Sequence, residues 1–320
     1  EQAFELFKQC SWAIWNSGIG GVVDLTQAVA HGWVHFVKYL LSRDYPPDDI
    51  PAHGKPLEYA VIRCPELVHT LLDAKATVNS RHVDIAISSD STSVLDKLLE
   101  GGLPSQYGIE RAVGLDWLDL VRRCVAKDMR MESTALMFAQ SADMVDLLLS
   151  ANCDVNANSS EGVPVFLGCC YHGSVEAVRH MVKRGARADA RDKLGKTALH
   201  FATHSDTALF LLEDCKLAAD SRNTQGETAV FVRGAQSGRR RDVLQLLVQR
   251  GLDVNARDQA GRTALLSAAE FGTRADCETL LELSADLRAS SADGSNALHF
   301  AAGNSFEADT IIRFLVESGV

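Results

Sequence analysis

Apolar residues recur at helical spacing in many short stretches of the chain. Residues 175–182 (VEAVRHMV) and 311–316 (IIRFLV) place apolar side chains every three or four positions, which predicts amphipathic helices. Residues 243–248 (VLQLLV) repeat the pattern and are followed by Gly251, as the first stretch is followed by Gly185. Because glycine readily adopts the left-handed backbone that ends a helix, the pattern predicts short helices that each stop at a turn.

A second pattern precedes these stretches. Residues 195–202 (GKTALHFA), 261–268 (GRTALLSA) and 294–301 (GSNALHFA) are variants of one phrase. Thr197 and Thr263 stand where a hydroxyl can accept a hydrogen bond from a free amide at the start of a helix. The small residues after them form a helix face against which a neighbour can pack closely. Each phrase therefore predicts an inner helix, and the apolar stretch after it an outer helix.

The helix pairs follow one another with a period of about 33 residues. In the second half of the chain, the first packing position of the inner helix falls at Ala135, Val165, Ala198, Ala229, Ala264 and Ala297. Looser matches toward the N-terminus fall at Asp24, Pro56, His82 and Gly108. A single pair cannot bury its apolar face alone, so these ten candidate pairs predict a stacked solenoid with one continuous core.

The phrase, with an outer helix that closes on Gly and "DVN" as in residues 251–255, resembles the ankyrin repeat. The resemblance is strong over 131–320 and degenerate over 24–130, where the Gly-x-Thr opening is missing. It implies an all-α ankyrin-repeat solenoid of about ten helix-turn-helix repeats with short finger loops. It also implies a concave partner-binding face, and a bracing role for His200 and His299 between neighbouring loops.

We expect three regions along the chain. Residues 1–23 contain an apolar stretch that predicts an N-terminal capping helix, ended by the glycines of 18–21. Over 24–130 the repeats are compressed to steps near 26 residues, which leaves no room for a projecting finger, although 44–54 forms a long loop with several prolines. Over 131–320 the fingers return. Both ends of the sequence look cut from a longer protein.

Charge and composition limit the classes of partner that the chain can bind. A net charge of −10 argues against nucleic acid, which calls for a basic face. The one basic run, 239–241, reads as a solvated turn. No stretch approaches the roughly 18 apolar residues of a membrane helix, so we expect no membrane insertion. An acidic array of this kind favours a protein or peptide partner of basic or neutral character, and we expect the array to be monomeric.

No combination of residues in the sequence predicts a catalytic site. The eight cysteines contain no C-x-x-C pair and suggest free thiols in a reducing compartment, the cytoplasm or the nucleus. His31 and His35 have a spacing that suits a metal, but Gly32 between them argues against one helical face. The glycines of 18–21 lack the Lys-Ser/Thr of a phosphate loop. We therefore expect no enzyme, no cofactor and no metal.

The groove remains as the candidate site. Aromatic side chains at the solvent-facing slot of the inner helices, and acidic or polar residues at the finger tips, are the kinds of group that anchor and orient a partner. The alternative is that Phe201 and Phe300 only stiffen the stack. Arg233 stands where a packing alanine belongs, so its repeat is expected to be distorted. The predicted partner-binding residues are Phe138, Tyr171, Asp192, Phe201, His204, Asp258, Glu270, Phe271, Asp293, Phe300 and Asn304.

Asn79, Asn156 and Asn255 each follow a valine and have a leucine eight positions earlier. This context resembles the one in which asparaginyl hydroxylases modify ankyrin-repeat proteins. The alternative is that each asparagine only serves its turn through local hydrogen bonds.

Two functions fit these patterns. The first is a non-catalytic protein-interaction scaffold, as an adaptor or the recognition arm of a larger protein, that binds on its concave groove. The second is a ligand-sensing or regulatory repeat domain that switches a catalytic or channel domain elsewhere. A sensor predicts a closed pocket, whereas a scaffold predicts an open groove.

Overall fold

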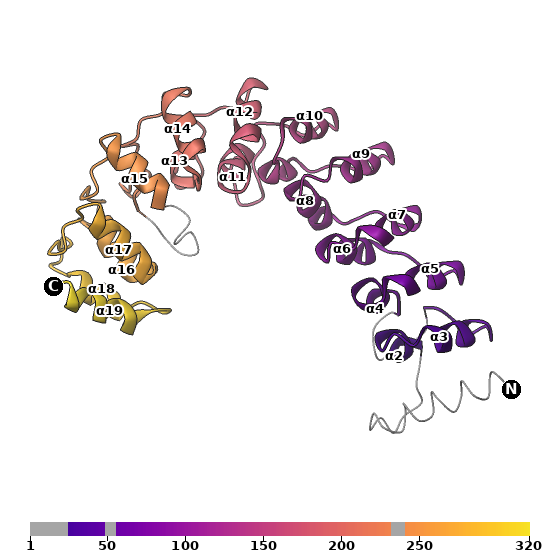
Figure 1. The fold of residues 1–320 in the computed structure, drawn as a ribbon. Coiled ribbons are helices and arrows are strands. Elements are labelled where there is room, and N and C mark those ends of the chain that lie inside the picture. Colours follow the sequence, from indigo (N-terminus) through magenta and orange to yellow (C-terminus); the bar gives the residue numbers. More distant parts are fainter. Residues whose placement is uncertain (1–24, 49–55, 232–240) are drawn as a thin grey trace. The chain divides into compact units, whose positions relative to one another are not determined.

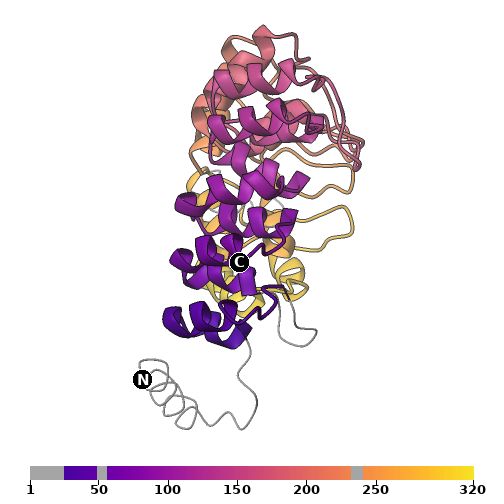
Figure 2. The same ribbon diagram turned by 90° about the vertical axis from the view of Figure 1, so that its right-hand side faces the viewer.

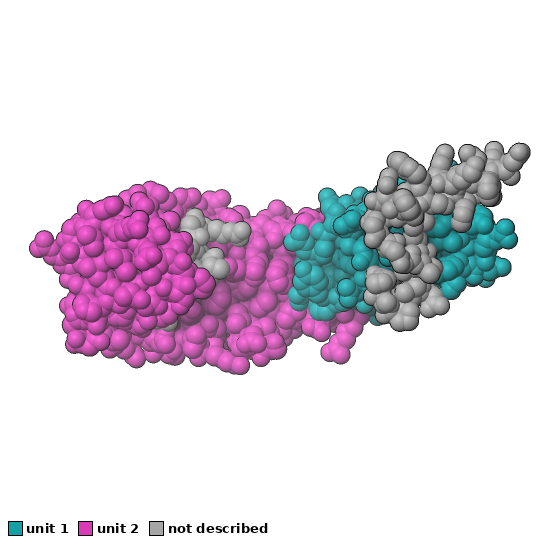
Figure 3. Space-filling model, turned by 90° about the horizontal axis from the view of Figure 1, so that it is seen from below, with its two compact units in different colours: residues 1–112, 126–129 teal, residues 113–125, 130–320 magenta. Residues whose placement is uncertain are grey.

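A computed structural model describes residues 25–48, 56–231 and 241–320 of the chain. The predicted capping helix at 1–23, Arg233, and residues 49–54 of the proline-containing loop lie outside these described residues. Two compact units divide the chain: unit 1 comprises 1–112 and 126–129, and unit 2 comprises 113–125 and 130–320. Figure 3 colours the two units, and the face of unit 2 seen there is hollowed. The sequence prediction put the regional boundary at 130.

All the regular elements in the described ranges are helices, apart from isolated bridges that pair Asn158 with Pro164 and Ser290 with Asn296. In unit 1 the helices alternate between inner and outer positions. They are α2 (Leu25–Ala30), α3 (Val34–Leu41), α4 (Pro56–Arg63), α5 (Pro65–Asp73), α6 (Ser80–Ser88), α7 (Thr92–Gly101) and the greater part of α8 (Gln106–Gly114). Within unit 1, α2 packs on α4 and α4 on α6, while the outer helix α5 packs on α7.

Unit 2 continues the alternation with longer loops. Its helices are α9 (Leu118–Ala126, except the last residue), the 3-10 helix η1 (Ser133–Phe138), α10 (Ala142–Ser150), α11 (Val165–His172), α12 (Val175–Lys183), α13 (Ala198–Phe201), α14 (Ser205–Glu213), α15 (Arg241–Gln249), α16 (Ala264–Phe271), α17 (Arg274–Glu282), α18 (Ala297–Ala302) and α19 (Ala308–Glu317). Inner helices pack on inner helices, as η1 does on α11, and outer on outer, as α10 does on α12 (Figure 1). The described part of the chain thus confirms an all-α solenoid.

Serine hydroxyls cap two outer helices, whereas the hydroxyl of Thr263, which the sequence predicted to cap an inner helix, makes no cap hydrogen bond at the start of α16. Ser141 and Ser174 accept hydrogen bonds from Met144 N and Ala177 N, at 3.2 and 3.1 Å, and so begin α10 and α12. Gly185 and Gly251 have φ of +95° and +90° just after α12 and α15, which confirms their role as left-handed stops. Asn152 adopts the same conformation after α10, where a glycine is missing.

Small side chains allow the inner helices to stack. A packing position of each inner helix is buried by its neighbours, which explains why the phrase repeats alanine there. In α11, Cys169 occupies the position of Ala202, Cys170 is the next residue, and both are fully buried. The fully buried alanines at these positions are Ala198, Ala202, Ala264, Ala268, Ala297 and Ala301.

The loops distinguish the two units. In unit 1, α5 ends at Asp73 and α6 begins at Ser80, and α7 ends at Gly101 five positions before α8, so these two described loops are short. In unit 2 the loops between outer and inner helices are longer, and Figure 2 shows them projecting from one side of its helices. Each finger closes as a tight hairpin, for example through Asn223 N to Glu227 O at 2.9 Å.

Consecutive fingers are joined by backbone hydrogen bonds. Thr224 N donates to Leu194 O at 2.8 Å, and Gln259 N donates to Gln225 O at 2.9 Å. Arg222 Nη1 adds a bridge, since it donates to Gly226 O of its own finger and to Arg257 O of the next, at 2.5 and 2.7 Å. Equivalent bridges, from Arg191 and Arg257, extend this finger ladder from residue 191 to residue 290.

The first prediction concerns local stability along the chain. Because the finger ladder joins only repeats of unit 2, coupling between neighbours is expected to be weaker in unit 1. Hydrogen exchange measured on the intact chain should show lower protection of helical amides over 25–130 than over 190–300. Equal protection in the two regions, or the reverse order, would show that the fingers do not govern local opening.

The second prediction tests the ladder itself. A Cβ at Gly226, where φ is +80°, would lie 3.0 Å from Gln259 N of the next finger, whereas Gly251, with φ of +90°, has no neighbouring atom within 4 Å of that position. Gly251→Ala carries only the backbone cost of about 1–2 kcal/mol. Gly226→Ala should be more destabilising and should speed exchange of the Gln259 amide at least tenfold, while Gly251→Ala leaves that amide protected. Similar exchange of Gln259 in both variants would contradict close finger contact.

Candidate partner-binding surface

The histidine of the repeated phrase braces two loops. Thr197 N donates to His200 Nδ1 at 3.1 Å, so Nε2 carries the hydrogen that His200 donates to Glu227 O of the next finger, at 3.2 Å. This confirms the bracing role predicted for His200. His299 forms the same box with Asn296, but its side chain is exposed. Both rings are engaged in holding the start of an inner helix.

Two of the predicted aromatic positions, Phe138 and Tyr171, converge in unit 2 on His172, which the sequence analysis did not predict. Phe138 at the end of η1 lies 4.7 Å, centroid to centroid, from the ring of His172 at the end of α11. Tyr171 meets His172 edge to face at 4.5 Å. Phe138 and Tyr171 are partly exposed, and His172 is exposed. We call Phe138, Tyr171 and His172 the aromatic step.

Hydrogen bonds from both neighbouring repeats hold the aromatic step in place. Gln140 Nε2 donates to Phe138 O at 2.9 Å and to His172 O at 3.0 Å. From the other side, Thr203 Oγ1 donates to Tyr171 O at 2.9 Å and lies 3.0 Å from Nδ1 of the exposed His204. The last carbonyls of α11 are therefore satisfied by side chains, and the end of the helix is fixed.

A glycine brings η1 close to α11. A Cβ at Gly168 would come within 2.5 Å of Met137 Cγ, so Met137 packs against α11 at a place that a larger residue would occupy. Gly168 stands at the slot where α13 and α18 carry Phe201 and Phe300, which are both partly exposed. The slot holds an aromatic side chain in α13 and α18 but a glycine in α11, where the partly exposed aromatic side chain, Tyr171, lies at the end of the helix instead.

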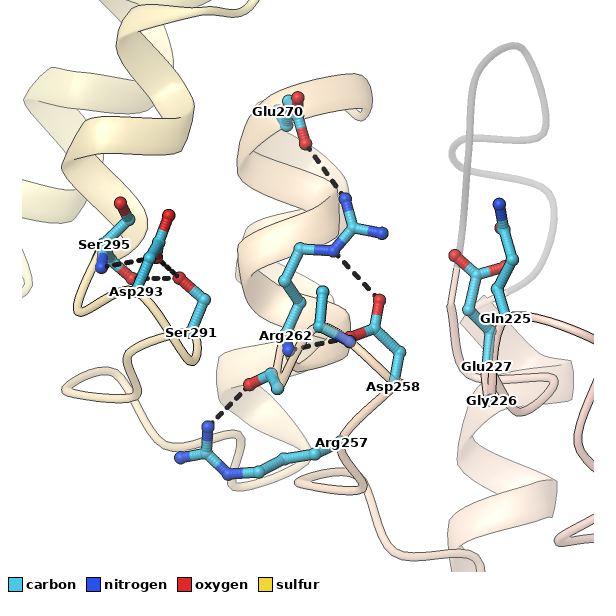
Figure 4. A network of polar contacts seen from close by, with 12 residues as sticks. Gln225, Gly226, Glu227, Arg257, Asp258, Arg262, Glu270, Ser291, Asp293 and Ser295 are labelled. Carbon is cyan, nitrogen blue, oxygen red and sulfur yellow. Dashed lines mark hydrogen bonds and ion pairs between the residues drawn. The ribbon is translucent and has the colours of Figure 1, made fainter.

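A charged group lies further along unit 2. Arg262 Nε contacts Asp258 Oδ2 at 2.9 Å and Arg262 Nη1 lies 3.5 Å from Glu270 Oε2, as Figure 4 shows. Phe271, the last residue of α16, is exposed beside this group. Arg262 and Glu270 keep part of their side chains accessible, whereas the side chain of Asp258 is almost completely buried.

The finger aspartates have a structural role that the sequence analysis did not assign. Asp258 Oδ1 accepts hydrogen bonds from Ala260 N and Arg262 N at 2.9 and 2.8 Å, and Asp192 Oδ1 accepts two in the same way. Asp293 remains exposed, and hydrogen bonds from the Ser291 hydroxyl and from Ser295 hold the pKa of its carboxyl below the usual value. The side chains that we expected to orient a partner first stabilise their own turns.

Two predicted residues are corrected by their burial. Asp258 and Asn304 are 8% and 6% exposed. Asn304 Nδ2 donates to Ala269 O and Gly272 O at 3.1 and 3.0 Å, and its Oδ1 accepts from the backbone ahead of α19. A side chain that satisfies four backbone groups inside the stack has no polar atom left for a partner, so both residues are excluded from the surface proposed below.

The three turn asparagines differ in their contacts. Asn156 Nδ2 donates to Gly185 O at 3.0 Å and Asn156 Oδ1 accepts from Arg187 N at 3.0 Å, so this amide ties its turn to the next repeat. Asn255 makes the same two bonds to the following turn. Asn79 instead begins α6, where its Oδ1 accepts from His82 N at 3.3 Å. The turn role is present in all three, and hydroxylation stays a prediction.

The described cysteines are free thiols, and most are buried. Burial raises the pKa of the Cys169 thiol to about 12, and burial, with nearby carboxylates, does the same for Cys277. A thiol that stays protonated at neutral pH is a poor nucleophile. No group of three or more His, Cys, Asp or Glu suited to a metal ion occurs among the residues that the structure describes. In the same ranges no helix has the length and apolar character to cross a membrane.

The repeat geometry defines the ankyrin class of helical solenoids, and comparison with known proteins agrees. The model of the family "Ankyrin repeats (3 copies)" matches residues 139–224, 165–258 and 231–320, which together make up more than half of the chain. The chain belongs to the ankyrin-repeat family. Ankyrin repeats are generally protein–protein interaction modules.

Individual relatives share the repeats only. The chain is 35% identical over 45% of its length to the B-cell lymphoma 3 protein homolog of Mus musculus, and 36% identical over 41% to the nuclear factor NF-kappa-B p105 subunit of Gallus gallus. It is 30% identical over 58% to neurogenic locus notch homolog protein 1 of Homo sapiens. The matches span 33%, 14% and 8% of these relatives, a third or less of each.

The crystal structure of the ankyrin repeat domain of Bcl-3 aligns with a TM-score of 0.41 at 25% identity, covering 66% of this chain and 86% of that one.

The sequence analysis missed His172, Gln140 and Thr203. The signal is the number of residues between the first packing position of an inner helix and the start of the outer helix that follows it. This number is smaller from Ala135 to the start of α10 at Ala142, and from Ala198 to the start of α14 at Ser205, than from Val165 to the start of α12. That shortening marks the repeats on either side of α11 as lacking a helical turn.

The third prediction concerns modification of the asparagines. A hydroxyl on Cβ of Asn156 or Asn255 leaves the amide and its two hydrogen bonds intact, so the modified protein should keep its fold. Peptide mass spectra of the protein purified from its native host should show species 16 Da heavier at Asn79, Asn156 or Asn255. Asn152 and Asn158, neighbouring asparagines without the leucine eight positions earlier, serve as internal controls. If the peptides are unmodified at all three predicted positions, hydroxylation is excluded and only the role of these asparagines in their turns remains.

Proposed function

We propose that this chain is a non-catalytic protein-binding module that holds a protein or peptide against the inner-helix face of unit 2. The surface consists of the aromatic step together with Phe201, His204, Glu270, Phe271 and Phe300, with the exposed Asp293 and the half-buried Asp192 at the finger rim. Partly exposed rings on successive inner helices support this most directly. Aromatic side chains supply large contact areas at little entropic cost, and they are enriched among residues that anchor interfaces.

Rigidity supports the same assignment. The inner helices rest on fully buried alanines and the fingers are joined by the ladder, so the surface is ordered before a partner arrives. A preorganised surface binds without the cost of ordering its own side chains and loops. Rim carboxylates add association rate and orientation toward a partner with basic groups, in line with the net charge of −10.

We also place the module in a reducing compartment, the cytoplasm or the nucleus, as a monomeric array that does not bind nucleic acid. The free thiols support the compartment, because cysteines in oxidising compartments are commonly paired. The acidic balance supports a protein partner, because nucleic-acid surfaces call for clustered basic residues.

The fourth prediction tests the binding surface. Partners captured from a native-host lysate on the intact chain, and identified by mass spectrometry, should bind Phe201→Ala and Phe300→Ala about thirtyfold more weakly, since truncating an anchor costs about 2 kcal/mol. Val316→Ala, an exposed apolar truncation on the outer helix α19, is the matched control and should bind normally.

Folding must be checked alongside affinity. The circular dichroism and hydrogen exchange of the two phenylalanine variants should remain close to those of the unmodified chain. Normal binding by both variants, or loss that accompanies unfolding, would reassign the two rings to stiffening of the stack and move the partner surface to the outer helices.

A further inference from the structure

The inner helix α11 is longer than its two neighbours. It has eight residues, whereas α13 has four and the 3-10 helix η1 has six. Counted from the shared anchors Ala135, Val165 and Ala198, α11 runs four residues further than either, which is about 6 Å of helix. The backbone turns to extended values of ψ directly after η1 and α13, at 134° and 124°, so neither neighbour continues alongside.

The extra turn of α11 carries Tyr171 and His172, and the ring of Phe138 lies beneath it on the shorter neighbour. The rings of Phe138 and His172 are inclined by 36°, and those of Tyr171 and His172 by 87°. Ring faces and ring edges therefore point in different directions around His172. Gln140 and Thr203 fix the backbone of this turn from both sides, at 3.0 and 2.9 Å. The backbone that carries the rings of the aromatic step is therefore fixed by hydrogen bonds from both neighbouring repeats.

The charged side chains in the segments that link inner to outer helices here are acidic, whereas Arg179 and Arg184, further along α12, pair with Asp214 and Asp146. Asp143, Glu176 and Asp206 are exposed in the first turns of α10, α12 and α14, the outer helices that follow the three inner helices. Within 138–146, 171–178 and 201–209, the segments that link inner to outer helices, the sequence has no lysine or arginine. These carboxylates also favour their own helix starts, but their charge remains available to a partner in solvent.

We propose that the aromatic step and this acidic edge together bind an arginine side chain from a basic segment of the partner, an inference that rests on the proposed function of the unit 2 surface. A guanidinium is planar and weakly hydrated, and it stacks on aromatic faces while its edge N–H groups donate to carboxylates. Asp143 and Glu176 lie on the two repeats that supply the rings. Lysine, a compact and strongly hydrated cation, matches this combination less well.

The test uses two labelled peptides that differ only in charge. One is Gly-Ser-Arg-Gly-Arg-Ser-Gly, and the other carries citrulline, the uncharged isostere, in place of each arginine. Fluorescence anisotropy with the intact chain should show the arginine peptide binding at least tenfold more tightly, with affinity that falls as salt is raised. Equal affinity for the two peptides would overturn the proposal.

Variants locate the contact. Tyr171→Ala should weaken the arginine peptide at least tenfold, Tyr171→Phe should keep the affinity within about twofold because the ring remains, and Glu176→Gln should weaken it several-fold. Tyr107→Ala, which truncates an exposed tyrosine of unit 1, is the matched control and should change nothing. Hydrogen exchange of α11 checks that Tyr171→Ala stays folded. If Tyr171→Phe loses affinity as Tyr171→Ala does, ring stacking is excluded.

Fluorine NMR of the chain labelled with 3-fluorotyrosine gives an independent position. Five tyrosine signals are expected, and the one lost in Tyr171→Phe should be the one that shifts on titration with the arginine peptide. A shift at other tyrosines alone would place the peptide elsewhere and overturn the proposal.

If captured partners depend on Phe201 and Phe300 but the peptide does not bind, the proposed function stands without this inference. If the peptide binds at Tyr171 while those variants bind partners normally, the arginine contact stands and the wider surface falls.

Discussion

The hydrogen bonds between consecutive fingers are the constraint on which the rest of unit 2 depends. Three fingers each give one backbone amide, that of Thr224, Gln259 or Ala292, to the finger before them, and an arginine such as Arg222 bridges carbonyls of two fingers. The approach is so close that a Cβ at Gly195, Gly226 or Gly261 would lie 2.9–3.1 Å from the next backbone nitrogen. Glycine is therefore required by space as well as by its positive φ. With the finger spacing fixed in this way, the inner helices below are held at one repeat distance, and the alanine faces can meet.

Fixed spacing gives meaning to variation within a repeat. Around α11, where the ladder does not reach, buried small side chains such as Cys169 set the spacing, and a repeat that lacks a helical turn leaves a step in the surface. The inner helices η1 and α13 create such steps on both sides of α11. The ends of a helix normally leave carbonyl groups unsatisfied, and here Gln140 and Thr203 satisfy them from the shortened repeats. The same shortening thus exposes the aromatic step and supplies the side chains that hold it.

Much of this fold follows from the sequence, because its determinants are local and repeated. The box formed by Thr197 and His200, the stops at Gly185 and Gly251, and the buried alanines each depend on a few residues at fixed spacing. The candidate surface is less predictable. Asp258 reads as an exposed finger tip, yet its carboxylate is consumed by two backbone amides and Arg262. Burial of a polar side chain depends on which partners its loop brings within reach, and one sequence does not carry that information.

Asn304 and His172 show the two ways in which a surface residue is misassigned from the sequence: one is predicted but buried, and the other is exposed but missed. Asn304 occupies a slot that faces the groove in a regular repeat, but in the last repeat its side chain turns inward to satisfy carbonyls of α16 and amides ahead of α19. His172 belongs to no recurrent motif, but it becomes the central ring of the aromatic step because the helices beside it are short. In a solenoid the repeated residues determine the scaffold, so the residues specific to one repeat are free to diverge. A partner surface is expected among these departures from the repeat, and the rings at the end of α11 are the departure that the neighbouring repeats support most directly.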